Sequence, residues 1–101
     1  MAVQPLSNEE IERGLEDLPG WSLRDDRLVR GYSFPGHLAA ARLVAEVAEA
    51  QEELGHHSDL TLGYNKVGVS VNTHSVGGKV TELDLRLAHR IEGIARGQGV
   101  S

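Results

Sequence analysis

Cysteine is absent from this 101-residue chain, and aromatic residues are scarce. The lack of cysteine excludes disulfides, thiolate metal sites and a cysteine nucleophile. One tryptophan, two tyrosines and one phenylalanine are too few for base-stacking platforms. Ten basic residues against fifteen acidic ones give a net charge of −5, whereas a nucleic acid backbone calls for a clustered basic surface. We therefore expect no direct binding of nucleic acid.

Long hydrophobic runs are missing as well. The most apolar segment, residues 38–50, is interrupted by Arg42, Glu46 and Glu49, so it is too short and too charged to span a bilayer. No basic start is followed by an apolar run, so we expect no signal peptide, no membrane association and a cytoplasmic location. The length predicts one domain over residues 1–101.

The first third of the chain predicts a helix and a β-hairpin after a loose terminus at residues 1–6. Ser7 and Glu10 have the spacing of a capping box, and Pro19-Gly20 is expected to end the helix. The apolar face of this helix comprises Ile11, Leu15 and Leu18.

Two strands are then predicted at residues 21–23 and 28–34, joined by a polar turn at residues 24–27. Leu28, Tyr32 and Phe34 have the same parity, so they are expected to face the same side of the sheet.

Residues 37–54 form the longest predicted helix, which is rich in alanine and has Gly55 as its expected C-cap. Two apolar stripes run along this helix. The first stripe comprises Leu43, Val44, Val47, Gln51 and Leu54. The second stripe comprises Leu38, Ala41, Ala45, Ala48 and Glu52. A helix with two such faces is expected to pack on the sheet with one and on a partner with the other, which predicts self-association.

A second hairpin is predicted from residues 60–64 and 67–71, with its turn at Asn65-Lys66. We expect Tyr64 to be a core residue in this hairpin. The expected apolar pairs are Leu60–Val71, Leu62–Val69 and Tyr64–Val67. Continued outward, the same register places His57 opposite His74, with His56 beside them. The sequence therefore predicts that three histidines come together.

The last part of the chain predicts a flexible loop at residues 76–79 and a helix capped by Thr81 and Asp84. Residues 97–101 are expected to form a frayed tail. The element order α-β-β-α-β-β-α predicts an α+β fold, with a four-stranded antiparallel sheet and helices packed on one face.

The segment between Glu52 and Asp84 carries a series of short motifs. Glu52 is followed by His56-His57-Ser58, then Tyr64-Asn65-Lys66-Val67, then Thr73-His74, and finally Asp84. These motifs and their spacing resemble the signature of the pterin-4a-carbinolamine dehydratases. Trp21 and the helix start at residues 81–84 also look like this family, so the resemblance extends from the first helix to the last.

The resemblance implies an α+β fold, assembly into dimers or tetramers, and no cofactor. It also implies a reaction, in which a 4a-hydroxytetrahydropterin, the spent cofactor of aromatic amino acid hydroxylases, loses water to give the quinonoid dihydropterin. The hydroxyl must be protonated to leave, and a ring nitrogen must give up its proton. Histidine, with an ordinary pKa of about 6.5, holds either protonation state near neutrality.

We assign proton transfer to His56 and His74, and chiefly the holding of the pterin ring to His57. Glu52 is a candidate to orient a histidine, whereas Asp84 needs no role beyond capping its helix. By resemblance, the residues that line the pterin pocket are His56, His57, Ser58, Thr73, His74, Ser75 and Val76.

Three features depart from the family pattern. Ser58 stands where proline is usual, which is expected to loosen the start of the strand. Leu60 stands where an aromatic residue is common, so a stacking surface is lost. The loop between His74 and Asp84 is one residue longer than its commonest form.

Other interpretations of the histidines remain. In one interpretation they are ordinary surface residues. In another they bind zinc together with Glu52. Against zinc, the neighbours His56 and His57 point to opposite sides of an extended chain. In a third, the chain keeps the fold but serves as a dimerisation or assembly partner of another protein, as some relatives in this fold do. His37 and His89, outside the motifs, are expected to be solvated.

Overall fold

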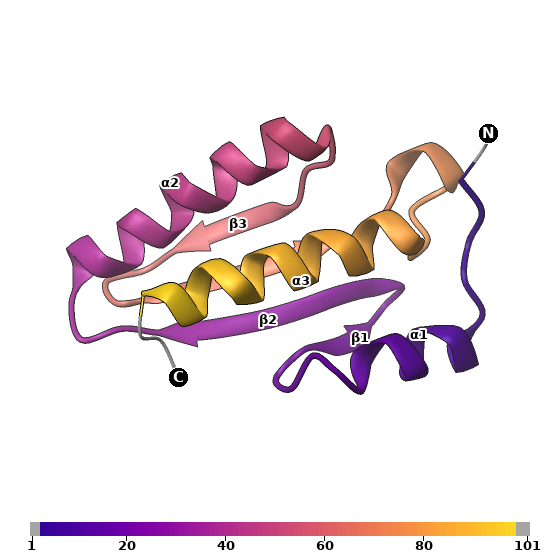
Figure 1. The fold of residues 1–101 in the computed structure, drawn as a ribbon, viewed down its shortest axis with the longest axis horizontal. Coiled ribbons are helices and arrows are strands. Elements are labelled where there is room, and N and C mark those ends of the chain that lie inside the picture. The colour runs from indigo at the N-terminus through magenta and orange to yellow at the C-terminus, as the bar shows by residue number, and fades with distance from the viewer. Residues whose placement is uncertain (1–2, 99–101) are drawn as a thin grey trace.

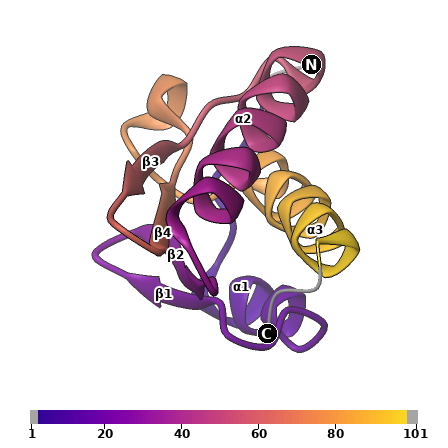
Figure 2. The same ribbon diagram turned by 90° about the vertical axis from the view of Figure 1, so that its left-hand side faces the viewer.

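The computed structural model describes residues 3–98, and these form three helices and a four-stranded sheet (Figure 1). The elements are α1 (Asn8–Leu15), β1 (Ser22–Arg24), β2 (Arg27–Ser33), α2 (His37–Leu54), β3 (Asp59–Leu62), β4 (Lys66–Val71), a 3-10 turn (His74–Val76) and α3 (Glu82–Gly97). The sheet order is β1-β2-β4-β3, and each neighbouring pair is antiparallel. The helices lie on one face of the sheet (Figure 2). The predicted α+β architecture is confirmed.

Local capping signals explain most of the helix ends. Ser7 with Glu10 and Thr81 with Asp84 each form the predicted capping box. Gly55 ends α2 in the left-handed conformation, with φ of +66°. The first helix ends earlier than expected, at Leu15, because tight turns take over from there to the buried Leu18 and on to the first strand.

The first hairpin follows the prediction closely. Asp25 and Asp26 form its two-residue turn with φ of +48° and +61°, a conformation that aspartate tolerates better than most residues. Leu28, Tyr32 and Phe34 are all buried on the helix-covered side, as their shared parity predicted.

The register predicted for the second hairpin is wrong by two positions. Leu60 pairs with Val69 and Leu62 with Val67, so Tyr64 does not pair with a strand residue. A shift of two keeps every side chain on its expected face, so Leu60 still packs against the core, whereas Leu62 is 43% exposed. The turn is centred on Tyr64-Asn65 instead of Asn65-Lys66, and Gly63 N donates to Lys66 O at 2.8 Å across it.

Contacts with the segment that joins β2 to α2 account for this turn. Phe34 N donates to Asn65 O at 2.8 Å, and Asn65 Nδ2 donates back to Phe34 O at 3.1 Å. Tyr64 stacks on His37 with ring centroids 6.2 Å apart and is 72% exposed, so its predicted place in the core is wrong. His89 is exposed, as expected. His37 is exposed too, but its Nδ1 lies 2.7 Å from Tyr64 O, so it helps to hold the turn and is not simply solvated.

Two segments expected to be loose are held by backbone hydrogen bonds. Leu6 N donates to Val80 O at 2.9 Å, which ties the N-terminal segment to the residue before Thr81. Residues 76–79, expected to be a flexible loop, are closed by a bridge between Thr73 and Lys79. Gly97 belongs to α3 and Gln98 caps it, so these two residues of the expected frayed tail are held by the helix. The rest of the expected loose ends, Met1-Ala2 and residues 99–101, lie outside the described residues.

The core lies between the sheet and the two long helices. Its fully buried side chains include Leu28, Tyr32, Leu43, Val47, Val67, Val71, Leu87 and Ile91. The second stripe of α2 faces away from this core, and Leu38 at its start is 64% exposed. Among residues 3–98, no helix combines the length and the apolar character that crossing a membrane requires.

A buried carboxylate on α3 joins that helix to the first hairpin. Glu92 Oε1 accepts a hydrogen bond from Tyr32 Oη at 2.6 Å and another from Trp21 Nε1 at 3.1 Å. Arg30 Nε lies 3.4 Å from the same oxygen, and its guanidinium sits over the Tyr32 ring. This cluster is on the half of α3 away from Asp84, so it supports the fold and not the histidines.

Candidate active site

A hollow of about 420 Å³ lies where the end of α2, the segment after β4 and the start of α3 meet. Its lining residues are Gly55, His56, His57, Asn72, Thr73, His74, Ser75 and Leu83. The structure therefore brings the three predicted histidines to one place.

The route by which the histidines meet differs from the prediction. Pairing between β3 and β4 stops at Asp59 and Ser70, so His57 and His74 are not cross-strand partners. His56 and His57 follow the left-handed Gly55 at the end of α2, whereas His74 begins the 3-10 turn. Two turns, at Gly55 and at His74–Val76, replace the expected strand register.

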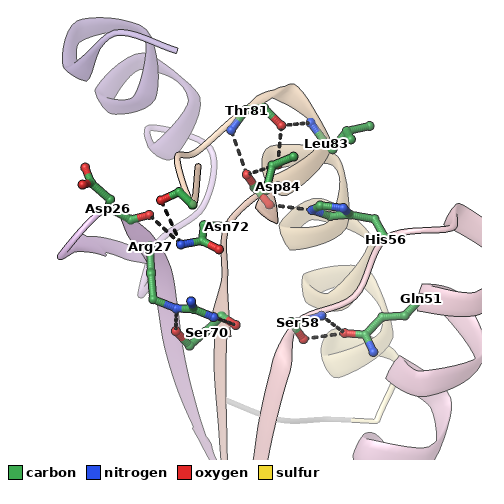
Figure 3. Close-up of polar contacts among 12 residues, drawn as sticks. Asp26, Arg27, Gln51, His56, Ser58, Ser70, Asn72, Thr81, Leu83 and Asp84 are labelled. Carbon is green, nitrogen blue, oxygen red and sulfur yellow. Dashed lines mark hydrogen bonds and ion pairs between the residues drawn. The ribbon is translucent and has the colours of Figure 1, made fainter. Parts of the chain in front are cut away.

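His56 is the most enclosed of the three histidines, with 12% of its side chain exposed. Its backbone N donates to Gln51 O at 3.2 Å, which fixes the start of the segment. Its ring Nε2 lies 2.6 Å from Asp84 Oδ1 (Figure 3). Thus a fully buried carboxylate anchors one imidazole at the hollow.

Asp84 does more than cap its helix. Its Oδ2 accepts from Thr81 N at 2.7 Å, which is the capping bond, and from Thr73 Oγ1 at 2.8 Å. Thr73 Oγ1 also lies 2.7 Å from Thr81 Oγ1. The carboxylate therefore links α3 to both histidine segments, because Thr73 directly precedes His74.

His57 also has a carboxylate partner, but this pair is exposed to solvent. Its Nε2 lies 2.6 Å from Glu52 Oε2, and the two side chains are 59% and 78% exposed. Solvent screens such a pair strongly, so it orients the ring only weakly. His74 is exposed, and its side chain forms no hydrogen bond within the described part of the chain. The three imidazoles thus range from firmly held to unrestrained.

Two of the predicted pocket residues do not line the hollow. Ser58 is turned toward α2, where its backbone N donates to Gln51 Oε1 at 3.0 Å (Figure 3). Val76 ends the 3-10 turn and is half-buried away from the lining. Leu60 packs against the core and does not line the hollow. The stacking surface that was expected to be lost at this position would therefore not have belonged to the hollow.

Three lining residues were not predicted: Gly55, Asn72 and Leu83. Asn72 Nδ2 donates to Gly78 O at 3.0 Å and so holds the loop that carries His74. Its place directly before Thr73-His74 was a usable signal. The signal for the other two was weaker: Gly55 adjoins the predicted site residue His56, and Leu83 adjoins Asp84.

Metal binding has no support from the arrangement of side chains. Between residues 3 and 98, no group of three or more His, Asp and Glu side chains is placed to hold a metal ion. Nε2 of His56 and Nε2 of His57 are each bonded to a carboxylate, and the two carboxylates come from different helices.

Comparison with known proteins identifies the family. The model of the pterin 4 alpha carbinolamine dehydratase family matches residues 4–94. Relatives from Streptomyces avermitilis and Streptomyces coelicolor, both provisionally named pterin-4-alpha-carbinolamine dehydratases, are 58% and 56% identical to this chain. The first alignment covers 100% of both chains, and the second covers 98% of each.

Solved structures agree with this result. The transcriptional coactivator/pterin dehydratase from Brucella melitensis superposes with a TM-score of 0.86 at 33% identity, over 91% of this chain and 99% of that one. A pterin dehydratase-like protein identified as a RuBisCO assembly factor in the alpha-carboxysome shares the fold at 18% identity, with a TM-score of 0.61 over 74% and 86%. This chain belongs to the pterin-4a-carbinolamine dehydratase family.

Proposed function

We propose that this chain is a cytoplasmic, single-domain dehydratase that converts 4a-hydroxytetrahydrobiopterin to quinonoid dihydrobiopterin and water. It would thereby recycle the pterin cofactor of aromatic amino acid hydroxylases. The observation that carries the proposal is the meeting of His56, His57 and His74 at one hollow. Family membership makes the pterin the substrate of choice.

The reaction needs one proton delivered and one removed. We assign delivery to the 4a-hydroxyl and removal from the ring nitrogen to His56 and His74, and we assign ring holding to His57. Each positioned proton transfer contributes a factor of roughly 10²–10⁴ to the rate. No bond to the protein forms, and the only products are the dihydropterin and water.

The test is dehydration of synthetic 4a-hydroxytetrahydropterin, followed by ultraviolet absorbance against the spontaneous rate. We expect fast turnover by the wild type and a loss of roughly tenfold or more in His56→Ala and in His74→Ala. His89→Ala is the matched control, because His89 is an exposed histidine outside the hollow. Unchanged turnover in a folded His74→Ala variant would contradict the assignment.

An assembly or coactivator role is the second candidate. The Brucella melitensis relative is described as a coactivator as well as a dehydratase, and the carboxysome relative as an assembly factor. Wild-type protein that is well folded but does not exceed the spontaneous rate would favour this role over catalysis. Loss of the histidines would then leave its function intact.

We also propose that the chain forms a homodimer or homotetramer through α2. The second stripe of this helix carries small apolar side chains, with Ala45 and Ala48 exposed near its middle. A row of alanines allows a second helix to approach closely, and exposed Leu38 extends the apolar surface.

A further inference from the structure

Asp84 has one carboxylate oxygen more than its helix cap requires. The capping box uses Oδ2 alone, which accepts from Thr81 N. Oδ1 lies 2.6 Å from His56 Nε2, at the end of another element and 28 positions away in sequence. Since the Asp84 side chain is fully buried, this second bond is shielded from water.

The direction of each hydrogen bond in this cluster follows from the number of available protons. Thr73 has one hydroxyl proton, and it donates that proton to Asp84 Oδ2. The proton between the two threonine oxygens therefore comes from Thr81. Oδ2 thus accepts two hydrogens, the pattern of a carboxylate oxygen that carries no proton of its own. An ionised carboxylate can only accept at Oδ1, so His56 Nε2 carries a hydrogen.

The other ring nitrogen of His56 is left for chemistry. Every fully buried side-chain nitrogen and oxygen among the described residues has a hydrogen-bond partner. Residues 3–98 supply none to Nδ1, so this atom lies on the accessible part of the ring. A neutral imidazole with hydrogen on Nε2 has an acceptor at Nδ1.

We infer that Asp84 is a positioning residue, which holds His56 with hydrogen on Nε2 so that Nδ1 serves as the base toward the pterin. The last step rests on the proposed function. Nδ1 takes the proton of the pterin ring nitrogen, the carbon–nitrogen double bond forms, and the carbon–oxygen bond breaks as His74 protonates the departing hydroxyl. Through Thr73 the same carboxylate fixes the start of the turn that carries His74.

Asp84→Asn separates this role from capping. The amide oxygen must face the two donors, Thr81 N and Thr73 Oγ1, so the helix cap is kept. The amide NH₂ then faces His56 Nε2, which has to accept, and the hydrogen moves to Nδ1. The variant should therefore fold, with the wrong tautomer at the reacting nitrogen.

The tautomer is read by long-range proton–nitrogen correlation spectra of protein with ¹⁵N-labelled histidine, followed upward in pH until the ring resonances no longer move. We expect hydrogen on Nε2 of His56 in the wild type and on Nδ1 in Asp84→Asn. Turnover of the variant should fall roughly tenfold or more in kcat, with KM little changed. Glu53→Gln, which alters an exposed carboxylate paired with Arg90, is the matched control and should change neither readout.

Hydrogen on Nδ1 in the wild type would overturn the inference, and so would a folded Asp84→Asn variant with turnover within about twofold of the wild type. Should the variant not fold, titration of the wild type with 7,8-dihydrobiopterin decides: bound pterin must shift the Nδ1 resonance of His56, and an unmoved resonance refutes the role. Absence of turnover in the wild type would refute the proposed function instead, while the spectrum still tests the hold of Asp84 on the ring.

Discussion

Gln51 and Ser58 are joined through a single oxygen. Gln51 Oε1 accepts from the backbone N of Ser58 at 3.0 Å and also from its hydroxyl. Gln51 is 4% exposed, so this oxygen depends on Ser58 for its hydrogens. The proline usual at this position has no N–H to donate. The serine was expected to loosen the start of β3, but a side chain of α2 holds it.

We predict that Ser58→Pro destabilises the chain, although it restores the common family residue. The free energy of unfolding should fall by about 1–3 kcal/mol, because the buried Gln51 oxygen loses both donors. In a Gln51→Leu background the same change should cost less. Urea unfolding of the wild type, the two single variants and the double variant gives the coupling energy between Gln51 and Ser58. An equal cost of Ser58→Pro in both backgrounds would show that the loss of stability does not come from this pair.

Two glycine-to-alanine changes should act in opposite directions. Gly55 has a positive φ, whereas Gly93 lies exposed within α3. At both positions there is room for an alanine Cβ, because no other heavy atom lies within 4 Å of where it would be. Gly55→Ala should destabilise by about 1–2 kcal/mol, the cost of the left-handed conformation. Gly93→Ala should stabilise by about 0.5–1 kcal/mol through helix propensity. Thermal unfolding checks both, and a shift of the same sign in the two variants would contradict the backbone argument.

Glu92 should make stability depend on acid pH. Burial alone would raise the pKa of Glu92, but hydrogen bonds from Tyr32 and Trp21 and the charge of Arg30 outweigh it and hold the pKa below its usual 4.5. The contribution is therefore present above about pH 4.5 and is lost as the pH falls through the lowered value.

Glu92→Gln should be less stable near neutrality by about 1–3 kcal/mol and should lose stability less steeply in acid. Chemical unfolding across pH measures both slopes. Glu46→Gln, at an exposed position on α2, is the control and should follow the wild type. Parallel slopes in Glu92→Gln and the wild type would show that another group is responsible.

Ala45→Arg should weaken self-association, because it places a long charged side chain in the middle of the exposed stripe of α2. Light scattering at micromolar concentration is expected to show a dimer or tetramer for the wild type and for Ala45→Ser, and a smaller species for Ala45→Arg. A monomeric wild type would remove the basis for the proposed assembly.

Most of the fold was predictable because local signals and the global arrangement agree. The capping boxes at Ser7 and Thr81, the left-handed Gly55 and the alternation of β4 each specify one element without reference to distant residues. The second hairpin was placed wrongly because its turn lacks a strong local preference. Contacts of Asn65 with Phe34 decide its position, and these join residues 31 positions apart.

The same distinction applies to the site. Motif spacing found the three histidines, yet it suggested only a cap for Asp84, because the bond from Oδ1 to His56 exists only once α2 and α3 are packed. The cluster at Glu92 escaped prediction for the same reason, since Trp21 lies 71 positions from its partner. When one side chain makes both a local and a long-range hydrogen bond, the sequence pattern predicts only the local one.

The hydrogen bond between Leu6 and Val80 has a practical consequence for handling the protein. It holds the N-terminal segment beside the loop that follows His74, whereas α3 runs about 24 Å from there to Gly97 (Figure 1). An affinity tag, a dye or a surface linker placed before Leu6 would therefore emerge close to the hollow. Attachment beyond the end of α3 keeps the bulky group at the far end of the molecule and leaves the approach to the histidines open.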